Sequence, residues 1–159
     1  MNKKRLFEDY INENIDVAYR FAYTYAGNSE DAEDIVNDSV VKAIKAINSL
    51  KDTKHIKTWF YKIISNTALT HIKKKKRFVH LECPEAVYAS SEDDYSEITF
   101  NSIIQNLDVK YRDVLVLRFM ENMQFNEIAK ILNLNENTVK TRLYTSLKLL
   151  KINMEGDEI

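Results

Sequence analysis

Hydrophobic positions recur at three- and four-residue steps along most of the chain, a pattern that predicts helices. One such stretch runs from Phe7 to Tyr25 and ends at Gly27-Asn28, a typical helix stop. A second starts after Ser29, and a third spans about Lys54 to Arg77. Only 2 Gly and 1 Pro occur among 159 residues. Few tight turns are therefore available, and we expect an all-α protein.

The segment from Gln124 to Lys151 predicts a helix-turn-helix. The apolar positions are Ile128, Ala129 and Leu132 in its first helix and Val139, Leu143, Leu147 and Leu150 in its second. Between them, Asn133 suits a left-handed turn and Asn135 suits an N-cap. Gln124 and Glu127 form a weak capping box. The alternative is an ordinary helical hairpin with a solvated face.

Polar side chains remain outward at the start of the second of these helices. They are of the kinds that reach base edges and phosphates in a major groove. The candidate DNA-reading residues are Thr138, Lys140, Thr141, Arg142 and Tyr144.

Charge is segregated along the chain, although the formal net charge is only -1. Residues 51–77 contain nine Lys or Arg and one acid, whereas residues 78–98 contain six acids, no Lys or Arg, and the only proline, Pro84. We expect an acidic linker at 78–98 between a helical domain at 1–77 and a helix-turn-helix domain at 99–153. A rigid, ordered loop is the alternative for the linker.

The second expected helix carries an acidic face. Asp31, Asp34 and Asp38 share one side, flanked by Glu33 and Asn37. Favourable interaction with the helix dipole explains acids in the first turn only. No histidine stands at a spacing typical of a carboxylate metal site, so we expect no metal or cofactor. A docking face for a basic partner explains the cluster best.

The third expected helix combines aromatic, polar and basic residues and ends in the run Lys73–Arg77. Aromatic rings beside positive charge suit single-stranded nucleic acid. A solvated helix end and a core role for Trp59 are the alternatives. No catalytic triad, Cys/His pair or phosphate-binding loop is present, so we expect no enzyme. The single Cys83, the absence of a signal peptide and the lack of a long apolar run favour the cytoplasm.

These features, in this order, resemble the extracytoplasmic-function (ECF) RNA polymerase sigma factors of bacteria from about Phe7 to Lys151. The matching motifs are DAEDIVNDSVVKA at 31–43, TWFYKIISN at 58–66, LDVKYRDVLVLR at 107–118, EIAKIL at 127–132 and TVKTRL at 138–143. Thr70, Asp108 and Asn133 depart from the family pattern, where Asp, Pro and Gly are common.

The resemblance implies a sigma region 2 domain and a sigma region 4 domain, with core RNA polymerase and promoter DNA as partners. The β′ clamp coiled coil would be bound by Asp31, Glu33, Asp34, Asn37 and Asp38, and region 4 would meet the β flap. The minus-10 element would be bound by Lys54, Trp59, Tyr61, Lys62, Asn66, Lys73, Lys74, Lys75, Lys76 and Arg77. The residues at 138–144 named above would read the minus-35 element. The linker would thread toward the RNA exit channel.

The resemblance also implies an anti-sigma factor, which is commonly membrane-anchored in this family, and no small-molecule substrate. Two other functions compete with this interpretation. A stand-alone, dimeric helix-turn-helix regulator would leave the acidic face unexplained. A helical metal-dependent or nucleotide-handling enzyme would lack partner histidines and a phosphate loop.

Overall fold

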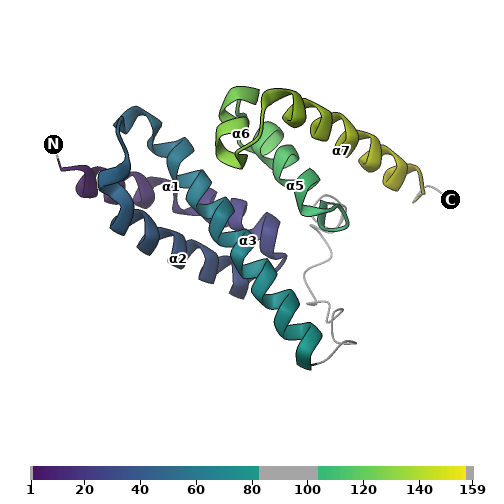
Figure 1. The fold of residues 1–159 in the computed structure, drawn as a ribbon, viewed down its shortest axis with the longest axis horizontal. Coiled ribbons are helices and arrows are strands. Elements are labelled where there is room, and N and C mark those ends of the chain that lie inside the picture. The colour runs from purple at the N-terminus through teal and green to yellow at the C-terminus, as the bar shows by residue number, and fades with distance from the viewer. Residues whose placement is uncertain (1, 83–103, 157–159) are drawn as a thin grey trace. The chain divides into compact units, whose positions relative to one another are not determined.

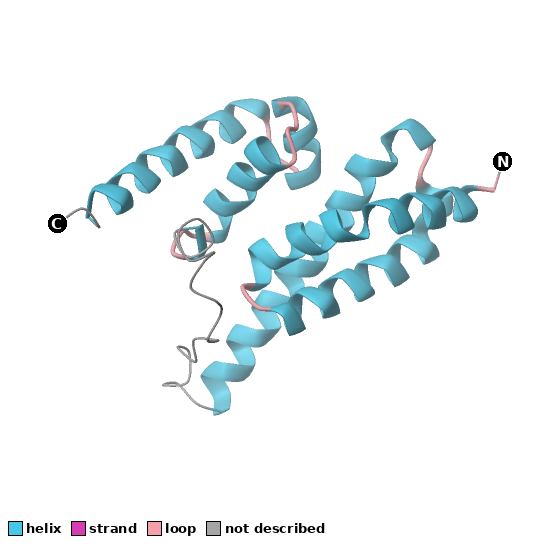
Figure 2. Cartoon of the chain, turned by 180° about the vertical axis from the view of Figure 1, so that it is seen from behind, coloured by secondary structure: helices cyan, strands magenta, loops and turns pink. Residues whose placement is uncertain are grey.

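The computed structural model describes residues 2–82 and 104–156, with the side chains of residues 2–77 and 104–151. The chain divides into two compact units, Met1–Ser91 and Glu92–Ile159. Within the described ranges the regular structure is helical and no strand occurs (Figure 2). The predicted all-α class is therefore confirmed.

Unit 1 is a bundle of three long helices, α1 (Lys3–Ala26), α2 (Ser29–Ala46) and α3 (Ile56–Glu82). Two 3-10 turns, η1 (Ile47–Ser49) and η2 (Thr53–His55), join α2 to α3. Each helix packs against the other two (Figure 1). The largest buried side chains of the bundle are Phe7, Phe21, Ile35, Phe60, Tyr61 and Ile64.

A glycine and an asparagine fix the boundary between α1 and α2. Gly27 ends α1 in the left-handed conformation, with φ 77°, which costs glycine little. Asn28 then caps α2, because its Oδ1 accepts the backbone N–H of Asp31 at 2.8 Å. The helix thus begins at Ser29, slightly earlier than expected. Asn14 interrupts α1 with φ -122° and ψ 16°.

The end of α3 differs from the sequence-based expectation. The helix continues to Glu82, so it covers the first five positions of the predicted linker, 78–82. The predicted helix end at Arg77 is therefore too early. The rest of the predicted linker, 83–98, lies outside the described residues.

Unit 2 contains α5 (Val109–Leu115), the π-helical turn η5 (Val116–Met120), α6 (Phe125–Leu132) and α7 (Glu136–Gly156). Its core forms where α5 and α6 pack against α7. The side chains at its centre are Leu107, Leu115 and Leu143, with Tyr111, Phe125, Leu149 and Leu150 packed around them.

The buried stripe of α7 shifts by one position relative to the prediction. Val139 and Leu143 are buried as expected, but Leu147 is 38% exposed and Ser146 is fully buried. A helix turns once in 3.6 residues, so a repeated step of four drifts off the buried face. The Ser146 hydroxyl donates a hydrogen bond to the Leu143 carbonyl oxygen at 2.6 Å. This bond offsets the free-energy cost of burying the hydroxyl.

Candidate docking and nucleic-acid interfaces

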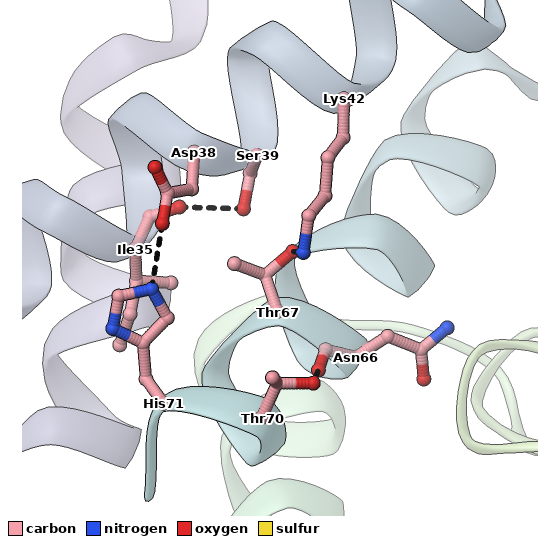
Figure 3. A network of polar contacts seen from close by, with 8 residues as sticks. All are labelled: Ile35, Asp38, Ser39, Lys42, Asn66, Thr67, Thr70 and His71. Carbon is pink, nitrogen blue, oxygen red and sulfur yellow. Dashed lines mark hydrogen bonds and ion pairs between the residues drawn. The ribbon is translucent and has the colours of Figure 1, made fainter. Parts of the chain in front are cut away.

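The acidic face of α2 is divided between exposed and paired side chains. Glu33, Asp34 and Asn37 are exposed. Asp31 and Asp38 also reach α3, although the Asp38 side chain remains 56% exposed: Lys75 Nζ lies 2.6 Å from Asp31 Oδ2, and His71 Nε2 lies 2.7 Å from Asp38 Oδ2 (Figure 3 shows the second contact). The sequence grouped all five residues as one outward surface. Among the described residues, the fold gives Glu33, Asp34 and Asn37 no side-chain partner and ties Asp31 and Asp38 to the neighbouring helix.

Asp31 is the more strongly held of the two paired acids. Burial alone would raise its pKa, but hydrogen bonds from Lys75 and Asn28 and the positive charge of Lys75 outweigh burial and lower it. The Asn28 amide donates to Asp31 Oδ2 at 2.8 Å. The carboxylate therefore stays ionised and fixed at the N-terminal end of α2, where the helix dipole also favours it.

The pairs follow from the antiparallel packing of α2 and α3. Lys42, one turn beyond Asp38, donates to Thr67 Oγ1 at 3.2 Å, and Thr67 lies one turn before His71 (Figure 3). Successive turns of the two helices thus meet in opposite order. This register brings together side chains that are far apart in the sequence.

The basic end of α3 is accessible to solvent. Lys73, Lys74, Lys76 and Arg77 are exposed, and Lys75 is exposed apart from its contact with Asp31. Lys54 in η2 and Lys62 and Asn66 in α3 are exposed as well. The described part of unit 1 therefore offers positive charge to phosphates along one helix.

The two aromatic residues predicted to contact the minus-10 element occupy different environments. Trp59 is half-buried, with its ring edge-on to Phe7 at 6.1 Å and 88°, so part of it remains available for stacking. Tyr61 is only 1% exposed and packs 4.8 Å from Phe21. A ring enclosed by the core has no free face for stacking in this conformation, and the contact of Tyr61 with DNA stays a prediction.

Thr70 occupies a position where the family commonly has Asp. It is exposed, and its hydroxyl donates to the backbone carbonyl of Asn66 at 2.9 Å (Figure 3). Threonine thereby satisfies its polar group within the helix itself. The Asn66 side chain carries the exposed amide at this point of α3.

In unit 2, α6, the turn and α7 form the predicted helix-turn-helix. Asn133 takes the left-handed conformation with φ 56°, as expected where glycine is usual. The backbone N–H of Thr138 donates to Asn135 Oδ1 at 2.8 Å, which confirms the predicted N-cap of α7. The Glu127 carboxylate accepts the Gln124 N–H at 3.2 Å, as in one half of a capping box.

The predicted DNA-reading residues lie along the first turns of α7. Lys140, Thr141 and Tyr144 are exposed, with Tyr144 at 68%, whereas Thr138 and Arg142 are half-buried. The ammonium of Lys140 lies 5.6 Å from the centroid of the Phe125 ring. This cation-π contact guides the Lys140 side chain over α6. The Thr141 hydroxyl donates to the Asn137 carbonyl at 2.9 Å.

Sequence reasoning missed a buried acid behind α7. Asp113 of α5 is 5% exposed, and its Oδ1 has no hydrogen-bond partner among the described residues. Burial raises its pKa to about 7, although the charges of Arg142 and Arg112 act in the opposite direction. Arg142, predicted to meet DNA, is thus also electrostatically linked to the interior of unit 2. The sequence signal for the burial of Asp113 is the position of this acid directly before the apolar run at 114–117.

No group of three His, Cys, Asp or Glu side chains in residues 2–77 and 104–151 is arranged to hold a metal ion. No helix within residues 2–82 and 104–156 is long and apolar enough to cross a membrane.

Comparison with known proteins links both units to one family. Residues 10–78 match Sigma-70 region 2, and residues 99–150 match Sigma-70, region 4. The chain is 37% identical over 143 residues to the RNA polymerase sigma factor SigV of Bacillus subtilis, covering 89% of this chain and 86% of SigV. It is 30% identical over 162 residues to the ECF RNA polymerase sigma factor SigW of the same organism, covering 91% and 87%.

Solved structures share the fold at low sequence identity. The sigma factor RpoE, in its complex with the anti-sigma factor NepR from Bartonella quintana, matches with a TM-score of 0.81 and 19% identity, covering 94% of this chain and 96% of RpoE. CnrH, in complex with the cytosolic domain of CnrY, matches with a TM-score of 0.69 and 18% identity, covering 96% and 90%. Identities this low speak for the fold alone.

Proposed function

Because this chain belongs to the ECF RNA polymerase sigma factors, we propose that unit 1 binds core polymerase and the minus-10 element and that unit 2 binds the minus-35 element. As a sigma factor it binds core RNA polymerase and directs promoter-specific transcription initiation. The observation that supports the division best is the succession of an acidic helix, a basic helix and a helix-turn-helix. The proposed boundaries are 1–77 for region 2, 78–98 for the acidic linker and 99–153 for region 4.

The polymerase-docking surface lies on α2. Glu33, Asp34 and Asn37 are exposed and would make the first contacts with the β′ clamp coiled coil. Asp31 and Asp38 lie on the same helix and would join the contact once their bonds to α3 are exchanged. Charge complementarity of this kind speeds association and excludes wrong partners more than it adds affinity.

The minus-10 surface lies on η2 and α3. Lys54, Trp59, Lys62 and Asn66 would hold the opened non-template strand, with Trp59 supplying the stacking face and the lysines supplying charge. Lys73–Arg77 would bind duplex phosphates. Tyr61 would join this surface only if its ring left the core, because it is 1% exposed and packs against Phe21.

The minus-35 surface is the leading part of α7. Lys140, Thr141 and Tyr144 would enter the major groove, with Thr138 at the N-terminal end and Arg142 near Asp113 of α5. The β flap would hold this unit on polymerase. Contacts made through an assembled polymerase need not be strong individually, because the two surfaces bind as linked sites.

Three further parts of the proposal concern the cell. The relatives are sigma factors, which are not enzymes, and we expect binding energy alone to melt the promoter, with no bond made by this chain. A partner of core polymerase works in the cytoplasm. An anti-sigma factor, which in this family is commonly membrane-anchored, would hold the protein inactive until a signal arrives.

Transcription in vitro tests the proposal directly. Core polymerase plus this protein should give promoter-specific transcripts from a promoter library. Asp34→Lys should weaken association with core polymerase, whereas Asp16→Lys, the same charge change at an exposed position of α1, should leave it intact. If no specific transcript appears and the two variants bind alike, the proposed function fails.

A further inference from the structure

Two acids assigned to polymerase docking are bonded to two residues of the DNA-facing helix. Asp31 pairs with Lys75 at 2.6 Å, and Asp38 contacts His71 at 2.7 Å. The residues of each contact lie 44 and 33 positions apart in the sequence. Among the acids of α2 in the described part of the chain, those that contact α3 connect the proposed docking surface with the proposed minus-10 surface.

We infer that these contacts link the two binding events: polymerase competes with Lys75 and His71 for Asp31 and Asp38, and its binding releases Lys75 and His71 toward DNA. The inference rests on the proposed docking and minus-10 surfaces. Oδ2 of Asp31 already accepts hydrogen bonds from Lys75 and Asn28, and the ammonium of Lys75 neutralises the charge of this carboxylate. A cation of the partner therefore gains less from Asp31 while Lys75 is in place. Docking on the β′ clamp therefore replaces an internal pair by an external one, and Lys75 becomes free to meet a phosphate.

The Asp31 pair is placed where a partner can reach it. It borders a groove of about 440 Å³, with Ile35 and Ile72 among its apolar lining residues. The Lys75 side chain is 58% exposed and that of Asp31 is 30% exposed. A cation from a partner can approach Asp31 from solvent without opening the core of the bundle.

The size of the effect follows from the exposure of the pair. Ion pairs open to solvent contribute about 0.2–1 kcal/mol, which corresponds to an affinity change of about 1.5- to fivefold. The two binding events favour each other, because polymerase draws Asp31 away from Lys75 and DNA draws Lys75 away from Asp31. Such coupling is reciprocal by linkage.

A matched pair of lysine variants tests the coupling. Lys75→Gln and Lys76→Gln each remove one positive charge from adjacent exposed positions, but only Lys75 is bonded to Asp31. We expect Lys75→Gln to bind core polymerase, without DNA present, about 1.5- to fivefold more tightly than Lys76→Gln does. In the same samples, NMR titration should show that the pKa of Asp31 is below its usual range in the parent chain and returns toward it in Lys75→Gln.

The outcomes separate the coupling from the function on which it rests. Equal polymerase affinities for the two lysine variants, or an Asp31 pKa that does not respond to Lys75→Gln, would overturn the coupling while leaving the docking surface in place. If Asp34→Lys also fails to weaken polymerase binding, the docking surface itself is wrong and the coupling falls with it. Tighter binding of Lys75→Gln together with weaker binding of Asp34→Lys supports both.

Discussion

Replacing the buried acid of unit 2 by its neutral isostere, Asp113→Asn, should change how stability depends on pH. Asp113 is 5% exposed, one of its oxygens has no hydrogen-bond partner in the part of the chain that the structure describes, and burial raises its pKa to about 7. In the unfolded chain its pKa returns to the ordinary value of 3.8. Between these two values the folded unit holds a proton that the unfolded chain has lost.

The sign follows from this proton balance. Stability falls with rising pH wherever the native state binds more protons than the unfolded state. The contribution of neutral Asp113 is therefore full below about pH 4 and is lost as pH rises through about 7. At about 1.4 kcal/mol per pH unit, the loss amounts to about 4 kcal/mol, a large part of the roughly 5–15 kcal/mol that typically holds a domain together.

Urea unfolding of the full chain at pH 5 to 8, followed by NMR of the Leu143 methyl groups, measures this dependence in unit 2. The single tryptophan, Trp59, reports unit 1 in the same samples as an internal control. We expect the pH-dependent loss in the parent chain and in Asp108→Asn, an exposed acid of the same segment, but not in Asp113→Asn. If Asp113→Asn retains the full pH dependence, the buried carboxyl is not its source and the reasoning is refuted.

Three further results are expected. Asn133→Val should lower the free energy of unfolding of unit 2 by about 1–2 kcal/mol, because a left-handed backbone penalises side chains branched at Cβ, whereas Asn133→Gly should not lower it. Equal free energies of unfolding for the two variants in urea would contradict the φ of 56° at Asn133. Tyr61→Ala should destabilise unit 1 by about 3–5 kcal/mol, measured by Trp59 fluorescence, and unchanged stability would place this ring outside the core. Lys140→Ala should weaken minus-35 binding and reduce the slope of log affinity against log salt by about 1, while sparing association with core polymerase; an unchanged slope would remove Lys140 from the phosphate contacts.

Local features of the fold could be predicted because their causes lie close together in the sequence. The apolar periodicity determines which stretches are helical, and Gly27, Asn133 and Asn135 act on the backbone within a few residues of themselves. The predicted stripe of α7 failed at Leu147, because a step of four departs from 3.6 residues per turn as it accumulates.

The assignment of side chains to interfaces could not be completed from sequence alone. Tyr61 lies on an aromatic-basic helix, and only the position of α1 shows that its ring faces Phe21 instead of solvent. The sequence predicts Asp31 and Asp38 as outward acids, whereas the packing of α3 places Lys75 and His71 against them. In each case the deciding neighbour belongs to a different helix.

The sequence by itself determined the helices, the turn chemistry of the helix-turn-helix and the order of motifs that marks a sigma factor, since these depend on residues a few positions apart. The tertiary structure decided which charges are free and which are paired or buried, as Asp113 shows beside Arg142. Burial and pairing depend on which surfaces pack together. That packing sets the solvation and electrostatic energy of each group, which its neighbours in sequence do not reveal.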